Sequence, residues 1–146
     1  MGDNFYEYGV ESVNDPKWTT VWKNVYTDYL GQIPWYTVLG NHDWYGNEKA
    51  QIEFSSVDTK WNMPDHFYTR VESFGYTRVG FIFIDTDLMN YGYNCFGIEC
   101  LLINFKKAGW TREKNTLEEQ FQWVETQLKL HQDKPYVFVV GHHNAH

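Results

Sequence analysis

The sequence WYTVLGNHD at residues 35–43 joins a short apolar run to a polar turn. The β-branched and aromatic side chains of this run, together with its length, predict a buried strand over residues 35–39. Two similar runs, at 79–84 and 136–140, predict further strands and continue into the polar sequences DTD and GHH. Ligands of open α/β sheets bind beyond the carboxyl ends of the strands. The three runs therefore predict one shared polar site.

Two other segments have the apolar spacing of amphipathic helices. In residues 18–30 the apolar side chains recur at steps of three and four, with Asp15 as the expected N-cap and Gly31 as the expected stop. Residues 117–131 show the same spacing, and a weaker strand is expected around 67–71. Helices that alternate with near-continuous apolar strands predict a layered α/β fold.

The chain has 146 residues, the length of about one domain, and 42% of them are hydrophobic. No internal repeat or Pro/Gly-rich linker divides the sequence, so residues 1–146 are expected to form a single domain. The formal net charge of −7 disfavours nucleic acid as a partner. No apolar run in the sequence approaches membrane-spanning length, and the start MGDNFYEYG has no signal-peptide pattern.

The two cysteines, Cys95 and Cys100, lie five residues apart in NCFGIEC. This spacing is not CxxC, which excludes a zinc ribbon or a thioredoxin-type motif. A local disulfide and two free thiols both fit the spacing, so the cysteines leave the redox compartment open.

Five residues close to the predicted strand ends or the chain start carry side chains suited to metal chemistry: Asp3, Tyr6, Asn41, His42 and His142. Their carboxylate, phenol, amide and imidazole groups form a mixed oxygen and nitrogen donor set, which suits iron, zinc or manganese. Each also has a simpler interpretation: Asn41 is an ordinary turn former, Tyr6 fits a core, and either histidine fits a structural role. Their order and spacing, taken together, favour a metal site.

The stretches that carry these residues resemble the purple acid phosphatases, a branch of the calcineurin-like metallophosphoesterase superfamily, and most closely their small tartrate-resistant type. The resemblance rests on GDNFYEYGV, IPWYTVLGNHDWYGN, AQIEFS, KWNMPDHFY and VFVVGHH, which occur in the family's order and at similar separations. It implies a four-layer αββα sandwich, in which helices flank two sheets. It also implies a secretory or lysosomal location.

The resemblance further implies a role for each of the five residues. Asp3 corresponds to the carboxylate that bridges two metal ions, and Tyr6 to the phenolate ligand of ferric iron. Asn41 and His142 correspond to ligands of the second, divalent metal. His42 corresponds to the histidine that contacts the phosphate and protonates the leaving group. The implied activity is phosphomonoester hydrolysis at a dinuclear centre of iron with iron, zinc or manganese.

Two motifs of the family fall outside the sequence. The first, DxG, would precede Met1, and the last, GHxH, would follow His146. We therefore expect a partial sandwich that lacks its first strand and its C-terminal strands, and a truncated domain with an incomplete catalytic centre.

Two other functions fit the sequence. One is a catalytically inactive phosphatase-like scaffold or binding protein, against which the intact GDNFY and GNHD motifs argue. The other is a phosphodiesterase of the wider superfamily, from which Tyr6 separates the purple type. Asp85 and Asp87 are interpreted as structural, and His66 as solvated. The substrate, the second metal and the oligomeric state are left open by the sequence.

Overall fold

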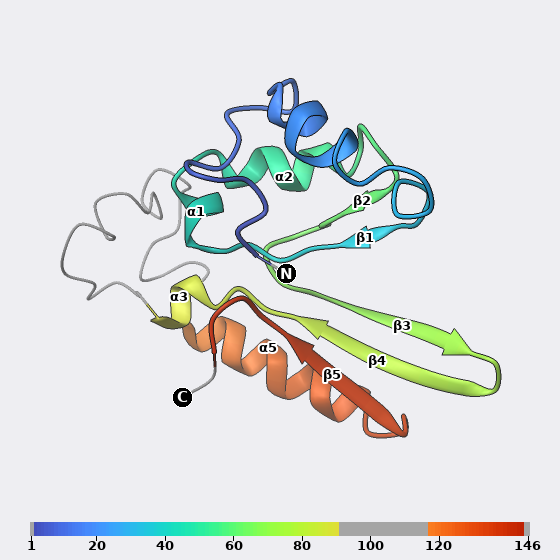
Figure 1. The fold of residues 1–146 in the computed structure, drawn as a ribbon. Helices are drawn as coiled ribbons and strands as arrows, with labels where there is room; N and C mark the ends of the chain where they lie inside the picture. The colour runs from blue at the N-terminus through green and yellow to red at the C-terminus, as the bar shows by residue number, and fades with distance from the viewer. Residues whose placement is uncertain (1, 91–116, 145–146) are drawn as a thin grey trace.

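The computed structural model describes residues 2–90 and 117–144 (Figure 1). Its elements in chain order are the π-helix η1 (Trp18–Lys23), β1 (Trp35–Tyr36), α1 (Asn41–Trp44), α2 (Glu48–Phe54), β2 (Trp61–Asn62), β3 (Tyr68–Phe74), β4 (Thr77–Phe83), α3 (Asp87–Asn90), α5 (Leu117–Leu130) and β5 (Tyr136–Val140). Among the described helices, none has the length and apolar character needed to cross a membrane. Cys95 and Cys100, whose pairing the sequence leaves open, lie outside the described residues.

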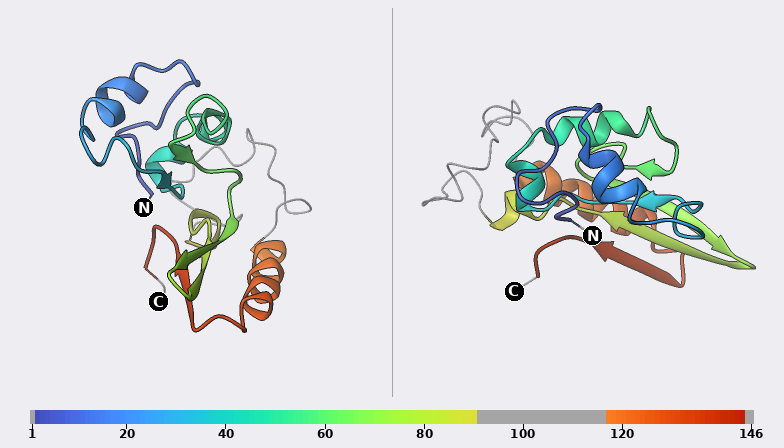
Figure 2. Two further views of the ribbon diagram at one scale, coloured as in Figure 1. Left: turned by 90° about the vertical axis from the view of Figure 1, so that its right-hand side faces the viewer. Right: turned by 45° about the horizontal axis from the view of Figure 1, so that its top comes forward.

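The strands form two small sheets. β1 pairs with β2 in parallel, and β3, β4 and β5 form a second sheet in that order. β3 and β4 are an antiparallel hairpin closed by Gly75 and Tyr76, whereas β4 and β5 run parallel and end together, with Phe83 opposite Val140. α5 lies along one face of the second sheet in both views (Figures 1 and 2). This arrangement places the carboxyl ends of β4 and β5 at the same edge.

Most of the predicted elements are confirmed. The runs at 79–84 and 136–140 correspond to β4 and β5, the weaker predicted strand is β3, and the second predicted helix is α5. In the run 35–39 only the first two residues pair as β1, although Val38 and Leu39 are both buried. The predicted α/β class is also confirmed.

The helix predicted over residues 18–30 is wrong in its length, because η1 ends at Lys23. Trp18 and Trp22 are buried, but Asp28 has φ +52° and takes the chain out of the right-handed helical region. The other apolar side chains of the predicted face are exposed by these fractions: Val21 36%, Val25 59%, Tyr26 38%, Tyr29 74% and Leu30 46%.

Two apolar cores hold the N-terminal half together. In the first, Trp18 stacks on Phe54 with ring centroids 3.6 Å apart, and Phe5 meets the edge of Trp18 at 4.6 Å. The second contains Leu39 and Trp44, both fully buried. Aromatic pairs of this kind add about 0.5–1.5 kcal/mol beyond their buried area. Because Phe5, Leu39 and Trp44 flank the predicted site residues in sequence, the cores fix the backbone on either side of the site.

Several apolar side chains of the second sheet and its helix are partly exposed. β5 is one edge strand of this sheet, and its consecutive residues Phe138 and Val139, which point to opposite faces, are 53% and 50% exposed. On α5, Phe121 and Leu128 from the predicted apolar face are 49% and 44% exposed. Within the described part of the chain, these apolar side chains are only partly covered.

Candidate metal centre

The predicted site residues come from three segments that the fold brings together: the chain start, the loop after β1, and the loop after β5 (Figure 1). The first two segments are joined by Asp43, whose side chain is fully buried. The Asp43 carboxylate accepts hydrogen bonds from the backbone N–H groups of Asn4 (3.0 Å), Phe5 (3.2 Å) and Gly40 (2.9 Å), and from Gln51 Nε2 (2.8 Å). Burial raises the pKa of Asp43, and these hydrogen bonds oppose the rise.

Asp3 is the point at which the three segments meet. Its backbone has φ +59°, a left-handed conformation that costs a non-glycine residue of the order of 1 kcal/mol. Asp3 Oδ1 accepts a hydrogen bond from the His42 backbone N–H at 3.1 Å and lies 3.4 Å from His142 Nε2. Asp3 Oδ2 accepts a hydrogen bond from the Tyr6 hydroxyl at 2.6 Å. The structure therefore brings the predicted ligands Asp3, Tyr6 and His142 together.

Gly40 makes this convergence possible. A Cβ atom at position 40 would collide with the Asp3 carboxylate and would lie 2.9 Å from His142 Cδ2. The carboxylate and the imidazole thus occupy the space that any side chain at this position would fill.

Tyr6 is oriented toward Asp3 although its side chain is 58% exposed. The pKa of the Tyr6 phenol is raised, mainly by its hydrogen bond to Asp3 and further by burial and by the negative charges of Asp3 and Asp43. The phenol is therefore protonated near neutral pH in this structure, and it must lose its proton to serve as a phenolate ligand.

His42 is held by its backbone and its ring. Its Nδ1 lies 2.6 Å from the Glu7 carbonyl oxygen, which can only accept, so we assign the ring proton of the neutral tautomer to Nδ1. The ring packs between Tyr6, at 4.3 Å, and Tyr45, at 5.0 Å. His42 Nε2 is therefore the ring nitrogen left to exchange a proton with a ligand.

Asn41 is oriented by a neighbour that the sequence did not identify. Its Nδ2 donates a hydrogen bond to the Tyr45 hydroxyl at 2.8 Å, which leaves Oδ1 as the acceptor of the amide. Among the described residues, Asn41 makes no hydrogen bond to Asp3, Tyr6 or His142, so this predicted ligand is near the convergent group in sequence but not joined to it.

Thr86 is a second residue that sequence reasoning missed. Its hydroxyl accepts hydrogen bonds from the backbone N–H groups of His142 (3.2 Å) and His143 (2.9 Å), and lies 3.0 Å from His143 Nδ1. Thr86 thus fixes the loop that presents His142. The DTD sequence after β4 was the available signal, but threonine carries no ligand pattern of its own.

Two buried carboxylates lie behind the site. Asp85 accepts hydrogen bonds from Trp44 Nε1 and from the Asp87 backbone N–H, each at 2.9 Å. Asp87 is fully buried; burial, followed by the negative charge of Asp85, raises its pKa well above the ordinary value. Gln120 of α5 makes two hydrogen bonds to the backbone of Asp85. Its Oε1 accepts from the Asp85 N–H at 2.8 Å, and its Nε2 donates to the Asp85 carbonyl at 2.9 Å. The helix is thereby tied to the strand end that carries these acids.

His66 is not solvated, contrary to the prediction, because its side chain is only 11% exposed. Its ring stacks on Trp44 at 5.5 Å, and its nitrogens lie 3.3 Å from Asp65 and 3.8 Å from Glu48. Burial alone would lower the pKa of His66, but the carboxylates of Asp65, Glu48 and Asp85 outweigh it and raise the pKa to about 9. The imidazolium is therefore the form that this environment stabilises.

The donors present fit part of a metal centre. In residues 2–90 and 117–144, no group of three or more His, Cys, Asp and Glu side chains is arranged to hold a metal ion. The convergent donors are one carboxylate, one imidazole and one phenol, so a metal at this position depends on Tyr6 as well as on Asp3 and His142. This mixed set of oxygen and nitrogen donors, two of which lie against Gly40, suits iron, zinc or manganese.

Comparison with known proteins identifies a family. The calcineurin-like phosphoesterase model matches residues 1–146. The human tartrate-resistant acid phosphatase type 5 is 31% identical over 144 residues, which cover 98% of this chain and 42% of that protein. Purple acid phosphatase 3 of Arabidopsis thaliana is 38% identical over 87 residues, 58% of this chain and 22% of that protein.

A solved structure is also similar. The protein described as "GAP50 the anchor in the inner membrane complex of Plasmodium" superposes with a TM-score of 0.70 at 28% sequence identity, over 96% of this chain and 42% of that one. The chain thus spans about two fifths of the length of the human relative and of this structure, 42% in each case.

Proposed function

The chain belongs to the calcineurin-like phosphoesterase family, and we propose that it carries part of the dinuclear metal centre of a purple-type acid phosphatase. The reaction would be the hydrolysis of a phosphomonoester. The single observation that carries the proposal is the convergence of the Tyr6 phenol and the His142 imidazole on the Asp3 carboxylate. The purple acid phosphatases among its relatives support it.

Four residues would hold the metal ions: Asp3, Tyr6, Asn41 and His142. Iron, paired with iron, zinc or manganese, matches their donor atoms. When bound, such ions neutralise the charge of a phosphoryl group and make water a stronger nucleophile. The Tyr6 proton, which is shared with Asp3 in this structure, leaves when the phenol becomes a ligand, so binding releases a proton.

The residues around the centre position the reacting groups. The Glu7 carbonyl holds His42 Nδ1–H, so a protonated His42 would deliver its Nε2 proton to the leaving-group oxygen. Tyr45 holds the Asn41 amide with Oδ1 free to act as a ligand. Thr86 fixes the backbone of His142. Each of these contacts reduces the motion of a group that must meet the substrate in one orientation.

The similarity to the purple acid phosphatases supports a secretory or lysosomal location and a phosphomonoester substrate. A net charge of −7 does not favour nucleic acid as the substrate.

A second candidate is a phosphatase-like scaffold without catalysis. It is supported by the structural similarity to the Plasmodium protein described as an anchor, with its TM-score of 0.70. The partly exposed apolar side chains of β5 and α5 also suit a binding role. The two candidates differ in whether the convergent residues bind metal.

Metal content separates them. We expect the purified chain, reconstituted anaerobically with iron and zinc, to retain metal after gel filtration, and we expect Asp3→Asn to lose it. Asp133→Asn is the matched control, because Asp133 is an exposed carboxylate paired with Lys134 and precedes β5, whereas His142 follows the other end of that strand. Metal retention equal in the wild-type chain and in Asp3→Asn would contradict the metal centre and favour the scaffold.

A further inference from the structure

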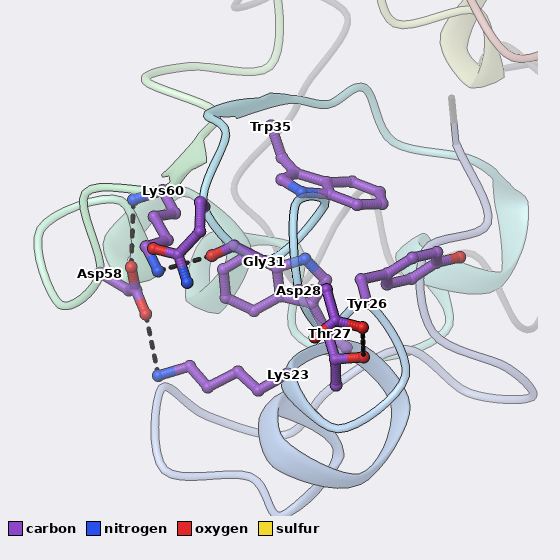
Figure 3. Close-up of a pocket in the computed structure, with 10 residues that line it drawn as sticks. Lys23, Tyr26, Thr27, Asp28, Gly31, Trp35, Asp58 and Lys60 are labelled. Atoms are coloured by element: carbon purple, nitrogen blue, oxygen red, sulfur yellow. Dashed lines mark hydrogen bonds and ion pairs between the residues drawn. The ribbon is translucent and has the colours of Figure 1, made fainter.

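A pocket of about 350 Å³ lies between the segment that follows η1 and the loop that precedes β2 (Figure 3). Trp35, the first residue of β1, and Lys60, which directly precedes β2, both line it. The candidate metal centre follows the other end of β1, so the two sites are at opposite ends of this strand. The pocket volume falls in the lower part of the range for small-molecule sites, roughly 300–1,000 Å³.

One wall of the pocket is aromatic. Tyr26 and Trp35 form a corner, with ring centroids 4.3 Å apart and planes inclined by 54°. Trp22 meets Trp35 edge-on at 6.5 Å and is itself 6% exposed, so it supports the corner from the core. Trp35 Nε1 donates a hydrogen bond to the Leu30 carbonyl at 3.0 Å, which fixes the indole. Tyr26, 38% exposed, offers an accessible aromatic ring to a ligand.

The facing wall is a row of charged groups that bond one another. Asp58 Oδ2 lies 2.9 Å from Lys23 Nζ, and Asp58 Oδ1 accepts a hydrogen bond from the Lys60 backbone N–H at 3.0 Å. Lys60 Nζ donates to the Gly31 carbonyl at 2.5 Å. Figure 3 shows this row of Lys60, Asp58 and Lys23 on the side of the pocket away from Tyr26. Along this row, the Lys60 and Lys23 ammonium groups are hydrogen-bond donors and the Asp58 carboxylate between them is an acceptor.

The charge balance of the pocket decides what it can bind. Lys23 and Lys60 are matched by Asp28 and Asp58, so the lining has no net charge. The two ammonium groups already bond to Asp58 and to Gly31, which leaves little attraction for a phosphate. The same ammonium groups repel a ligand cation that would otherwise stack on the aromatic rings.

A neutral sugar matches all of these features. A hexopyranose ring has an apolar face of C–H groups, which packs on an aromatic ring, and a rim of hydroxyls that both donate and accept hydrogen bonds. We propose that this pocket binds one neutral hexopyranose unit, with its C–H face on Tyr26 and Trp35 and its hydroxyls on the row formed by Lys23, Asp58 and Lys60. Because the pocket is at the far end of β1 from the metal centre, the bound sugar is held rather than transformed.

The experiment is a calorimetric titration of the purified chain with three neutral trisaccharides: cellotriose, maltotriose and mannotriose. We expect saturable binding of at least one of them in the millimolar range. Tyr26→Ala removes the exposed ring and is expected to weaken that binding about tenfold, the size of one aromatic contact. Tyr29→Ala is the matched control, because Tyr29 is 74% exposed, lies three residues away and does not line the pocket.

Asp58→Asn tests the polar wall, because it keeps the shape of the side chain and removes the charged acceptor. It is expected to weaken the same binding, and circular dichroism and denaturation of each variant check that the fold is kept. The proposal is overturned if none of the three sugars binds saturably, or if Tyr26→Ala binds as well as Tyr29→Ala. It is also overturned if inorganic phosphate or tetramethylammonium binds to this pocket, with loss in Tyr26→Ala, more tightly than the sugars do.

Discussion

At the scale of single residues, the hydrogen bond from Asn41 Nδ2 to the Tyr45 hydroxyl, 2.8 Å long, determines which amide atom is left to bind a ligand. Tyr45→Phe removes this acceptor and keeps the ring beside His42. We expect metal affinity to fall about tenfold, as for other partners that orient metal ligands. Calorimetric titration of the metal-free chain with zinc, and with ferric iron as a chelate, measures the change.

Tyr8→Phe is the control for that substitution, since Tyr8 is 59% exposed and its ring lies 6.4 Å from Tyr45. Both variants should unfold at denaturant concentrations close to that of the wild-type chain. A Tyr45→Phe variant that binds metal as tightly as Tyr8→Phe would show that Asn41 needs no such orientation.

The raised pKa of His66 makes the stability of the fold depend on pH. This pKa rises from an ordinary 6.5 to about 9 in the fold. The folded state therefore binds the proton more tightly than the unfolded state does. The stabilisation is fully present below about pH 6.5 and is lost as the pH rises through about 9. The pKa difference corresponds to roughly 3 kcal/mol.

Urea denaturation at pH values across this range tests the role of His66. The free energy of unfolding of the wild-type chain should fall as the pH rises, and His66→Gln should remove most of that fall. If the His66→Gln variant kept the same pH dependence, the stabilisation would have to come from another group.

At the scale of elements, the turn between β3 and β4 depends on Gly75. Gly75 has φ +62°, whereas the φ of Tyr76 is not positive. These angles match a two-residue hairpin turn in which the first residue is glycine. A Cβ at Gly75 would meet no atom within 4 Å, so the cost of a side chain here is conformational rather than steric. We expect Gly75→Val to lower the free energy of unfolding by about 1–2 kcal/mol.

Chemical denaturation compares Gly75→Val with Tyr76→Val, which changes the neighbouring exposed position of the same turn. The Tyr76 substitution should have a much smaller effect. An equal loss of stability in both variants would mean that the turn does not depend on a left-handed glycine.

The local sequence pattern predicted the strands better than the first helix. The short β-branched runs predicted β4 and β5 well, because strand composition and strand length are local properties. The pattern of residues 18–30 predicted a helix more than twice the length of η1, which has 6 residues. Periodicity could not reveal that Trp18 and Trp22 alone reach the aromatic core, nor that Asp28 adopts φ +52°.

At the scale of the whole molecule, the candidate site exists only because three distant segments meet at Asp3. Motif order predicted that Asp3, Tyr6 and His142 belong together, and the geometry brings them within contact. The groups that hold them were not predictable in the same way. Glu7 acts through its backbone carbonyl, which accepts a hydrogen bond from His42. Thr86 acts through its hydroxyl, which accepts a hydrogen bond from the His142 backbone N–H. Neither interaction produces a recognisable sequence motif.

The visible absorption spectrum of the chain reconstituted with ferric iron tests whether Tyr6 is a ligand of the metal centre. We expect a phenolate-to-iron absorption band in the wild-type chain, its loss in Tyr6→Phe, and its retention in Tyr8→Phe. The band tests the convergence of Tyr6 and Asp3 without requiring any enzymatic activity. A band that persists in Tyr6→Phe would contradict the claim that Tyr6 is a ligand of this metal centre.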